Sequence, residues 1–292
     1  MLLVNLGTPA APTPEAVRAY LGEFLSDPRV VKLPRFIWLP VLHLVVLRTR
    51  PEKSAEKYRQ VWMPEGSPLA VYTARQAALL AKKTGRQVEY AMRYGQPSIP
   101  SVLQRFTVKP VVVPLYPQYA ESTTEAVADM IPRGSRMVQE FHDHPAYIGA
   151  VAAKVRHHWE RHGRAPLVMS FHGLPKRGGE KYAEQCRATG ALLAKKLGIP
   201  KDEWQVTFQS RFGFAEWLQP YTEPTLVGLA HAGTPRVDVV CPGFVCDCLE
   251  TLEEIGITAK QAFIAAGGKD LGVIPCLNDS PEWIDALAEI AA

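Results

Sequence analysis

Motifs that bind nucleotides or mark common hydrolases are absent from this 292-residue sequence. It contains neither the GxGxxG fingerprint of dinucleotide-binding folds nor the GxxxxGK[ST] loop that cradles phosphates. It also lacks the GxSxG nucleophile motif and the HExxH zinc motif. These absences argue against a nicotinamide-dependent oxidoreductase, a P-loop ATPase, an α/β-hydrolase and a zinc protease.

Long hydrophobic runs are lacking as well. The longest apolar stretch, residues 36–47, is interrupted by Pro40 and His43 and is too short to span a membrane. The chain opens without the basic region and apolar core of a signal peptide. We therefore expect a cytoplasmic protein that does not span a membrane.

Cysteine is sparse, and none of the five cysteines belongs to a CxxC pair. Reduced thiols in a cytoplasm fit this usage. Cys241, Cys246 and Cys248 lie close together in the sequence, but a zinc or iron–sulfur site normally needs four ligands. We expect no iron–sulfur cluster and no required cofactor.

Neither basic nor acidic residues are in large excess, since the formal net charge is only +4. This value is too small to indicate a nucleic-acid surface, so we expect no nucleic-acid partner. The basic residues are nevertheless concentrated between Arg29 and Arg59, where only Glu52 and Glu56 are acidic. The concentration indicates either a solvated basic face or an anion-binding surface.

What is present is typical of a folded protein, with 47% apolar and 21% charged residues. The length predicts two domains, which we place at residues 1–135 and 136–292, with the last helix packing back on the first lobe. The 25 prolines predict sharply ended elements joined by short connections.

Short apolar runs recur along the chain, and each ends abruptly in polar, glycine or proline residues. They are residues 2–9, 88–95, 111–119, 167–175, 205–213, 237–244 and 262–268. We predict that they are strands buried on both faces. Amphipathic helical patterns lie between most of them, for example at 147–163 and 186–198, with Gly163 and Gly198 as helix stops. This alternation predicts an α/β fold of doubly wound parallel sheets.

The two halves resemble each other loosely, which indicates an internal duplication. The second strand of each half ends in Arg-aromatic-Gly, at 93–95 and at 211–213. We therefore expect two Rossmann-like lobes with a cleft between them. Ligands in such folds bind outside the carboxyl ends of the strands.

His172 occupies such a strand end, because it follows the buried run LVMSF and precedes Gly173-Leu174-Pro175. A base or ligand role and a structural hydrogen-bonding role are both open for it. Farther on, Asp247, Glu250 and Glu254 have the spacing i, i+3 and i+7, which would stack three carboxylates along one helical face. The helix dipole explains acids at the helix start but not Glu254. A divalent cation passing along this face would relieve the repulsion.

Residues 36–47, which we call the apolar lip, are apolar nearly all round, and this indicates either burial or contact with something apolar. The lip has more apolar surface than one packed helix face requires, chiefly at Trp38, Leu39, Leu42, Val45 and Val46. Core packing explains it as well as exposure does. We expect part of it to be exposed at the mouth of the cleft, where its cationic flanks suit a flat hydrophobic ligand with carboxylates, or an anionic bilayer.

Nine short motifs resemble, in the same order along the chain, those of the bacterial ferrochelatase family, whose members are class II chelatases. They are NLGTP (5–9), FLSDPRVV (24–31), GSPL (66–69), AMRYG (91–95), LYPQY (115–119), SFHGLP (170–175), FQSRFG (208–213), WLQPYT (217–222) and CPGFVCDCLETLEE (241–254). The resemblance runs over almost the whole chain. It implies a metal chelatase, a lyase that inserts Fe²⁺ into protoporphyrin IX to form protohaem in the terminal step of haem biosynthesis.

The resemblance also implies the site. By motif, His172 and Glu250 correspond to the catalytic, metal-contacting residues, which face each other across the cleft, and Asp247 and Glu254 form an acidic track. The residues implied on the porphyrin side are Leu6, Trp38, Arg93, Tyr94 and Tyr116. We assign proton abstraction to His172, with a metal-presenting carboxylate on the opposite face of the porphyrin.

Two other functions stay open. One is a chelatase for another tetrapyrrole, coproporphyrin or sirohydrochlorin, and the other is a non-catalytic carrier of haem or metal. The partners expected in the main hypothesis are protoporphyrin IX and Fe²⁺. We also expect a monomer, with peripheral contact at the anionic inner face of the cell membrane.

Overall fold

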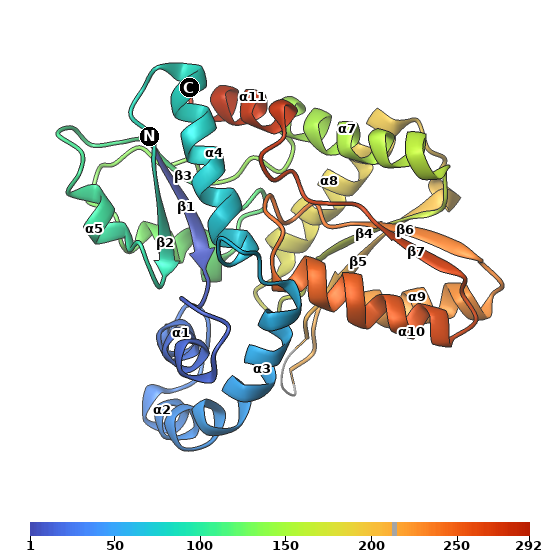
Figure 1. Ribbon diagram of the computed structural model, residues 1–292, viewed down its shortest axis with the longest axis horizontal. Helices are drawn as coiled ribbons and strands as arrows, with labels where there is room; N and C mark the ends of the chain where they lie inside the picture. The colour runs from blue at the N-terminus through green and yellow to red at the C-terminus, as the bar shows by residue number, and fades with distance from the viewer. Residues whose placement is uncertain (212–214) are drawn as a thin grey trace. The chain divides into compact units, whose positions relative to one another are not determined.

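The computed structural model describes residues 1–211 and 215–292, so Phe212 and Gly213 of the FQSRFG motif lie outside the described residues. The chain divides into two compact units (Figure 1). The first comprises residues 1–115, 120–139 and 291, and the second comprises 116–119, 140–290 and 292. Each unit is built on a parallel sheet with helices packed on it, so the predicted α/β fold class is confirmed. The predicted boundary at 135/136 stays a prediction.

The sheet of the first unit has the strand order β2-β1-β3, with every pair parallel. Its strands are β1 (Leu2–Gly7), β2 (Glu89–Tyr94) and β3 (Val112–Pro114). Leu2, Leu3 and Val4 of the central strand are wholly buried, as expected for a strand covered on both faces.

The helices of the first unit fall into those outside the apolar lip and those that form it. The former are α1 (Pro14–Ser26), α4 (Pro68–Thr84), α5 (Ile99–Leu103), the π-helix η2 (Glu121–Glu125) and α6 (Ala126–Ala128). Helix α1 starts where the Thr13 hydroxyl accepts a hydrogen bond from the Ala16 N–H at 3.3 Å, with Pro14 in its first turn. Helix α4 packs on both β1 and β2.

The apolar lip lies in a run of helix made of α2 (Arg35–Val41), the π-helix η1 (Leu42–Val46) and the start of α3 (Leu47–Val61). Trp38, Leu42 and Val46 recur every four residues, and they are buried against Leu25 of α1. The Trp38 indole also donates a hydrogen bond to the Leu25 carbonyl at 2.6 Å. Core packing, one of the two alternatives for this segment, therefore holds for these three residues, because the helical repeat turns them all toward α1.

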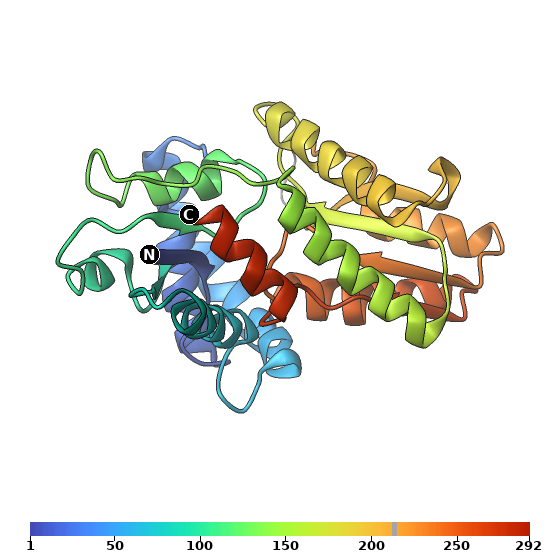
Figure 2. The same ribbon diagram turned by 90° about the horizontal axis from the view of Figure 1, so that it is seen from above.

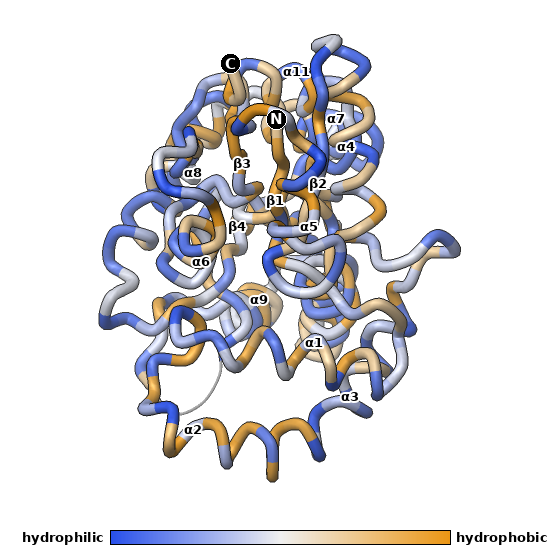
Figure 3. The backbone as a smooth tube through the Cα atoms, turned by 90° about the vertical axis from the view of Figure 1, so that its left-hand side faces the viewer, coloured by the Kyte–Doolittle hydropathy of each residue, from blue (hydrophilic) through white to orange (hydrophobic). Residues whose placement is uncertain are grey.

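Other positions of the lip face outward, as the expectation of partial exposure required. Phe36 is 81% exposed and Leu44 is 58% exposed, with Ile37, Val41 and Val45 also exposed. Figure 3 marks the apolar positions of α2 along the backbone in orange. Among the helices formed by the described residues, none is both long enough and apolar enough to cross a membrane.

The sheet of the second unit has the order β5-β4-β6-β7, again with every pair parallel. Its strands are β4 (Leu167–His172), β5 (Trp204–Gln209), β6 (Arg236–Val240) and β7 (Asp270–Val273). In both units the first strand is central, with the second strand on one side and the third on the other. This shared order is what an internal duplication predicts.

The helices of the second unit are α7 (Pro145–His162), α8 (Glu180–Leu197), the short 3₁₀ helix η3 (Lys201–Glu203), α9 (Thr222–His231), the π-helix η4 (Glu250–Ala259), α10 (Lys260–Ala265) and α11 (Pro281–Ile290). Gly163 and Gly198 end α7 and α8 with φ of 77° and 69°, as predicted. Helix α11 packs on α7 (Figure 2). Its expected packing on the first lobe stays a prediction.

One predicted strand is wrong. Residues 262–265 form the end of α10 and residues 266–268 a turn, and the next strand is β7. The apolar run ends a helix that continues from η4, with Phe263 wholly buried and Ile264 40% exposed. The chain then turns at Gly267, where φ is 103°.

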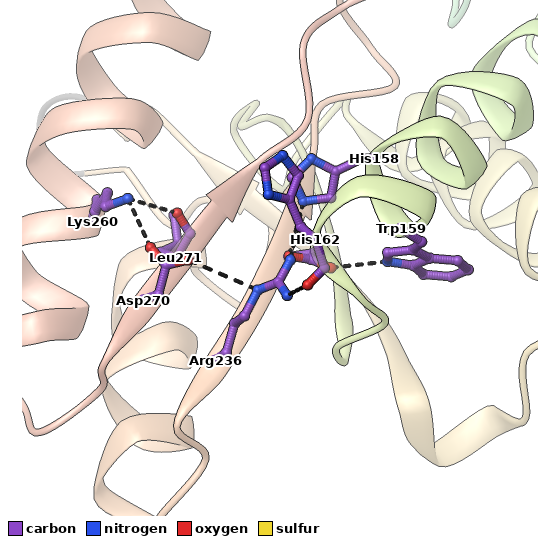
Figure 4. Close-up of polar contacts among 8 residues, drawn as sticks. His158, Trp159, His162, Arg236, Lys260, Asp270 and Leu271 are labelled. Atoms are coloured by element: carbon purple, nitrogen blue, oxygen red, sulfur yellow. Dashed lines mark hydrogen bonds and ion pairs between the residues drawn. The ribbon is translucent and has the colours of Figure 1, made fainter.

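A buried polar cluster joins α7 to the sheet at the amino end of β4, the opposite end from His172. Asp238, which pairs with Leu167 of β4, accepts hydrogen bonds from the Trp159 indole at 2.9 Å and the Arg236 guanidinium at 2.8 Å. Figure 4 shows the Trp159 and Arg236 side chains that make these contacts. A Cβ on Gly272 would lie 2.2 Å from the Asp238 carboxylate, so only glycine fits beside it. The cluster therefore anchors the sheet rather than the site.

Candidate active site of the second unit

His172 is the last residue of β4 and is half-buried, after five buried residues of the same strand. Its Nδ1 lies 2.7 Å from the Gly173 carbonyl oxygen. A carbonyl only accepts, so Nδ1 donates the proton and the neutral ring keeps its lone pair on Nε2. The ring centroid lies 6.4 Å from that of Phe244. His172 is therefore oriented to take a proton, or bind a metal ion, through Nε2.

Glu250 is the first residue of η4, a ten-residue π-helix. Its side chain is half-buried, and its backbone carbonyl accepts a hydrogen bond from the Gln209 amide at 2.8 Å. Burial, with the neighbouring Glu250 carboxylate, holds the pKa of the Cys248 thiol well above its usual value. The thiol therefore stays protonated.

Glu254, one turn farther along η4, has its carboxylate held by the end of β5. It accepts hydrogen bonds from the Ser210 N–H at 2.8 Å and from the Ser210 hydroxyl. The Gln209 amide lies 3.3 Å from the same carboxylate. Ser210 has a positive φ of 63°, which aims both of its donors at Glu254.

Asp247 does not lie on the helix, so the expected row of three carboxylates on one helical face is wrong for this residue. The helical turns begin after Asp247, which is buried. Its carboxylate accepts hydrogen bonds from the Asn278 amide at 2.6 Å and the Thr251 hydroxyl at 2.9 Å. Asn278 in return accepts from the Asp247 N–H at 2.8 Å. Asp247 thus fixes the start of η4 against the segment after β7.

The sheet register brings the proposed reactive groups to one edge. His172 pairs with Gln209, and the Gln209 side chain contacts Glu250 and Glu254. His172, Glu250 and Glu254 therefore lie around the carboxyl ends of β4 and β5.

The residues expected on the porphyrin side have varied surroundings. In the first unit Leu6 is half-buried near the end of β1, while Tyr94 is only 1% exposed. The Arg93 guanidinium forms an ion pair with Asp27 and lies 4.4 Å from the Tyr94 ring centroid. The Tyr94 hydroxyl donates to Asp27 at 2.9 Å, and burial raises the pKa of this phenol. In the second unit Tyr116 is half-buried.

Sequence reasoning missed the residues that hold the acids in place. Gln209 and Ser210 lie within the FQSRFG motif, and Gln209 ends a buried strand as His172 does. That shared position is the signal that could have found Gln209. Asn278 carries no such signal, because its contact with Asp247 depends on the loop after β7.

Within residues 1–211 and 215–292, no group of three or more His, Cys, Asp and Glu residues is arranged to hold a metal ion. All five cysteines are buried free thiols. The expectation that no iron–sulfur cluster is required stays a prediction.

The fold is that of the chelatases. SirB from Bacillus subtilis, solved with Fe³⁺, superposes with a TM-score of 0.54 at 16% identity, covering 78% of this chain and 92% of that chain. A multi-domain protein from Deinococcus radiodurans, described as similar to chelatases, gives a TM-score of 0.52 at 15% identity, covering 77% of this chain and 51% of that chain.

Sequence comparison identifies the family. The ferrochelatase family model matches residues 1–292. The ferrochelatase of Aromatoleum aromaticum is 55% identical, covering 99% of this chain and 86% of the relative, and that of a Polaromonas species is 54% identical, covering 100% and 86%. The chain belongs to the ferrochelatase family, as the motifs predicted, and it is a metal chelatase.

Proposed function

We propose that this protein inserts Fe²⁺ into protoporphyrin IX, releasing two protons and forming protohaem in the terminal step of haem biosynthesis. Family membership supports the reaction. The single structural observation in its favour is that one sheet edge carries both His172, with Nε2 available, and Glu250 at the start of η4.

His172 takes the pyrrole protons in this mechanism. The porphyrin must lose two N–H protons before its four nitrogens can bind the metal, and an imidazole is a suitable base near neutral pH. The hydrogen bond from Nδ1 to the Gly173 carbonyl fixes the tautomer and the ring orientation, so Nε2 receives the proton.

Glu250 presents the iron, with His172 as the second metal contact. Carboxylate oxygen and imidazole nitrogen are both ligands for Fe²⁺ that release it readily to four pyrrole nitrogens. Glu254 and Asp247 extend the negative charge behind Glu250 and would attract the dication toward it.

Porphyrin contacts are proposed on each unit separately. In the first unit Leu6 and Arg93 line the porphyrin side with the buried Trp38 and Tyr94 packed behind them, and Tyr116 lines it in the second. The buried Arg93–Asp27 pair supports this wall by fixing the chain that leads to the apolar lip.

The apolar lip also makes peripheral, reversible contact with an anionic membrane surface, at the cytoplasmic face of the cell membrane. Exposed Phe36 and Leu44 would enter the interface, while exposed Arg48 would meet the lipid phosphates. No nucleic-acid partner and no further subunit are part of this proposal.

The test is to mix the metal-free protein with protoporphyrin IX and Fe²⁺ without oxygen and to follow the porphyrin absorption bands. We expect conversion to the haem spectrum. Parallel reactions with coproporphyrin and sirohydrochlorin compare the three tetrapyrroles as substrates. If either is converted faster than protoporphyrin IX, that tetrapyrrole is the substrate and the proposal is wrong on this point. Binding of porphyrin without conversion of any of the three would indicate a carrier.

A further inference from the structure

The Gln209 side chain forms hydrogen bonds with both strand β4 and helix η4. It ends β5 and is only 5% exposed. Its Oε1 accepts a hydrogen bond from the Ser170 hydroxyl at 2.7 Å. Its Nε2 donates to the Glu250 carbonyl at 2.8 Å and lies 3.3 Å from the Glu254 carboxylate. The amide therefore links the strand that carries His172 to the helix that carries Glu250.

The backbone of Gln209 holds the turn after His172. The Gly173 N–H donates to the Gln209 carbonyl at 2.7 Å. A Cβ on Gly173 would lie 2.6 Å from that oxygen, so the close approach requires glycine. The carbonyl of Gly173 in turn receives the His172 Nδ1 proton. One residue thus contacts the segments that carry both proposed reactive groups.

Buried hydroxyls fix the orientation of the Gln209 amide. Oε1 can only accept, so Ser170 donates to it, and the Ser170 oxygen accepts from Thr222 at 2.8 Å. Thr222 accepts from Thr207 at 2.9 Å. A reversed amide would place its oxygen against two other acceptors, the Glu250 carbonyl and the Glu254 carboxylate. The two N–H donors are therefore directed at η4.

We propose that Gln209 is a positioning residue that sets the location of Glu250 relative to His172 for metal transfer. This proposal rests on the proposed function. A displacement of about 1 Å in a reacting group can cost about 10²-fold in rate, so the fixed amide has a direct kinetic consequence. Gln209 does not touch the substrates and acts through the first turn of η4 and the turn at Gly173.

The test replaces Gln209 with methionine, which keeps the length of the side chain and removes the amide. We expect kcat to fall at least about tenfold and the KM for Fe²⁺ to rise, with the KM for porphyrin changed less than about twofold. A general loss of packing would not change the two KM values selectively. Gln209→Asn, which keeps an amide but cannot reach the Glu250 carbonyl, should show the same pattern and provides a second variant if the methionine variant does not fold.

Gln185 is the matched control. It is another buried glutamine, 6% exposed, whose amide bridges the Tyr119 N–H at 2.7 Å and the Glu140 carboxylate at 2.6 Å. Gln185→Met should lower the melting temperature by an amount similar to Gln209→Met, with kcat and both KM values within about twofold of the unchanged protein. Kinetics for Gln209→Met that match this control would overturn the proposal.

Hydrogen–deuterium exchange gives a readout that does not depend on turnover. In Gln209→Met the amides of residues 250–255 and 172–174 should exchange faster than in the unchanged protein, and in Gln185→Met they should not. Unchanged exchange in both segments would overturn the positioning role. If the unchanged protein inserts no metal, the proposed function fails, while the exchange data still decide whether Gln209 fixes these two segments.

Discussion

At the scale of single residues, the three acids of the second unit differ in what already binds them. The Glu254 carboxylate accepts hydrogen bonds from Ser210 and Gln209. The Asp247 carboxylate accepts hydrogen bonds from Asn278 and Thr251. The Glu250 carboxylate raises the pKa of the neighbouring Cys248 thiol, and a thiol is only a weak donor. Glu250 is therefore the acid best able to bind an incoming metal ion.

Replacing His172 with alanine tests the proposed base. His172→Ala should bind protoporphyrin with little change in Kd, because the fold of β4 depends on the buried residues before it. Its kcat should fall by about 10²-fold or more, the usual effect of losing a general base. Fluorescence titration measures binding and the anaerobic assay measures turnover, and turnover equal to the unchanged protein would exclude the role.

Glu250→Gln tests metal presentation, because it keeps the shape of the side chain and removes the charge that attracts a dication. Losing an outer-shell partner of a metal ligand typically lowers activity about 10- to 100-fold. Turnover of Glu250→Gln should fall by more than this, because the metal-presenting group itself is lost. The melting temperature should change little, since the Gln209 bond is to the Glu250 backbone. Unaltered rates across a range of Fe²⁺ concentrations would show that Glu250 does not present the metal.

At the scale of elements, apolar runs and tertiary contacts explain which strands and helices the sequence predicted correctly and which it did not. Strands β1 and β4 were predictable because they are continuous apolar runs, buried on both faces. Residues 262–268 were mistaken for a strand because a short apolar run has no period that separates it from a buried helix face. The position of Asp247 was missed because its bond to Asn278 delays the start of the helix, and nothing local in the sequence reveals that contact.

The apolar lip is the element whose function depends on exposure. The combined charge reversal Arg48→Glu and Arg50→Glu should weaken binding to anionic liposomes, and the effect should shrink with salt, because surface charges are screened within about 8 Å at physiological ionic strength. Phe36→Ser should weaken binding at every salt concentration, since Phe36 contributes apolar surface.

The control for this experiment is the reversal Lys195→Glu and Lys196→Glu at the end of α8, which changes the net charge equally on exposed residues of the second unit. It should leave liposome sedimentation unchanged. Equal effects of the two reversals would mean that net charge, rather than the lip, determines binding, and would remove the proposed membrane contact.

At the scale of the whole molecule, the sequence predicted two parallel sheets and their similarity because both halves repeat the same order of apolar runs and helices. The shared strand order of β2-β1-β3 and β5-β4-β6 confirms this similarity. His172 was singled out in the sequence by its place at a strand end, and Glu250 was assigned through its motif; the catalytic roles of both stay predictions. The sequence could not predict that Gln209 joins them, since that requires the register of β4 and β5 and the docking of η4.

The central claim is that this chain catalyses iron insertion rather than carrying iron or porphyrin. The most direct test is the number of haem molecules formed per protein molecule when excess protoporphyrin IX and Fe²⁺ are supplied without oxygen. We predict many turnovers, with haem exceeding protein several-fold and depending on His172. Haem that stops at one molecule per protein, with the remaining porphyrin unconverted, would contradict the account.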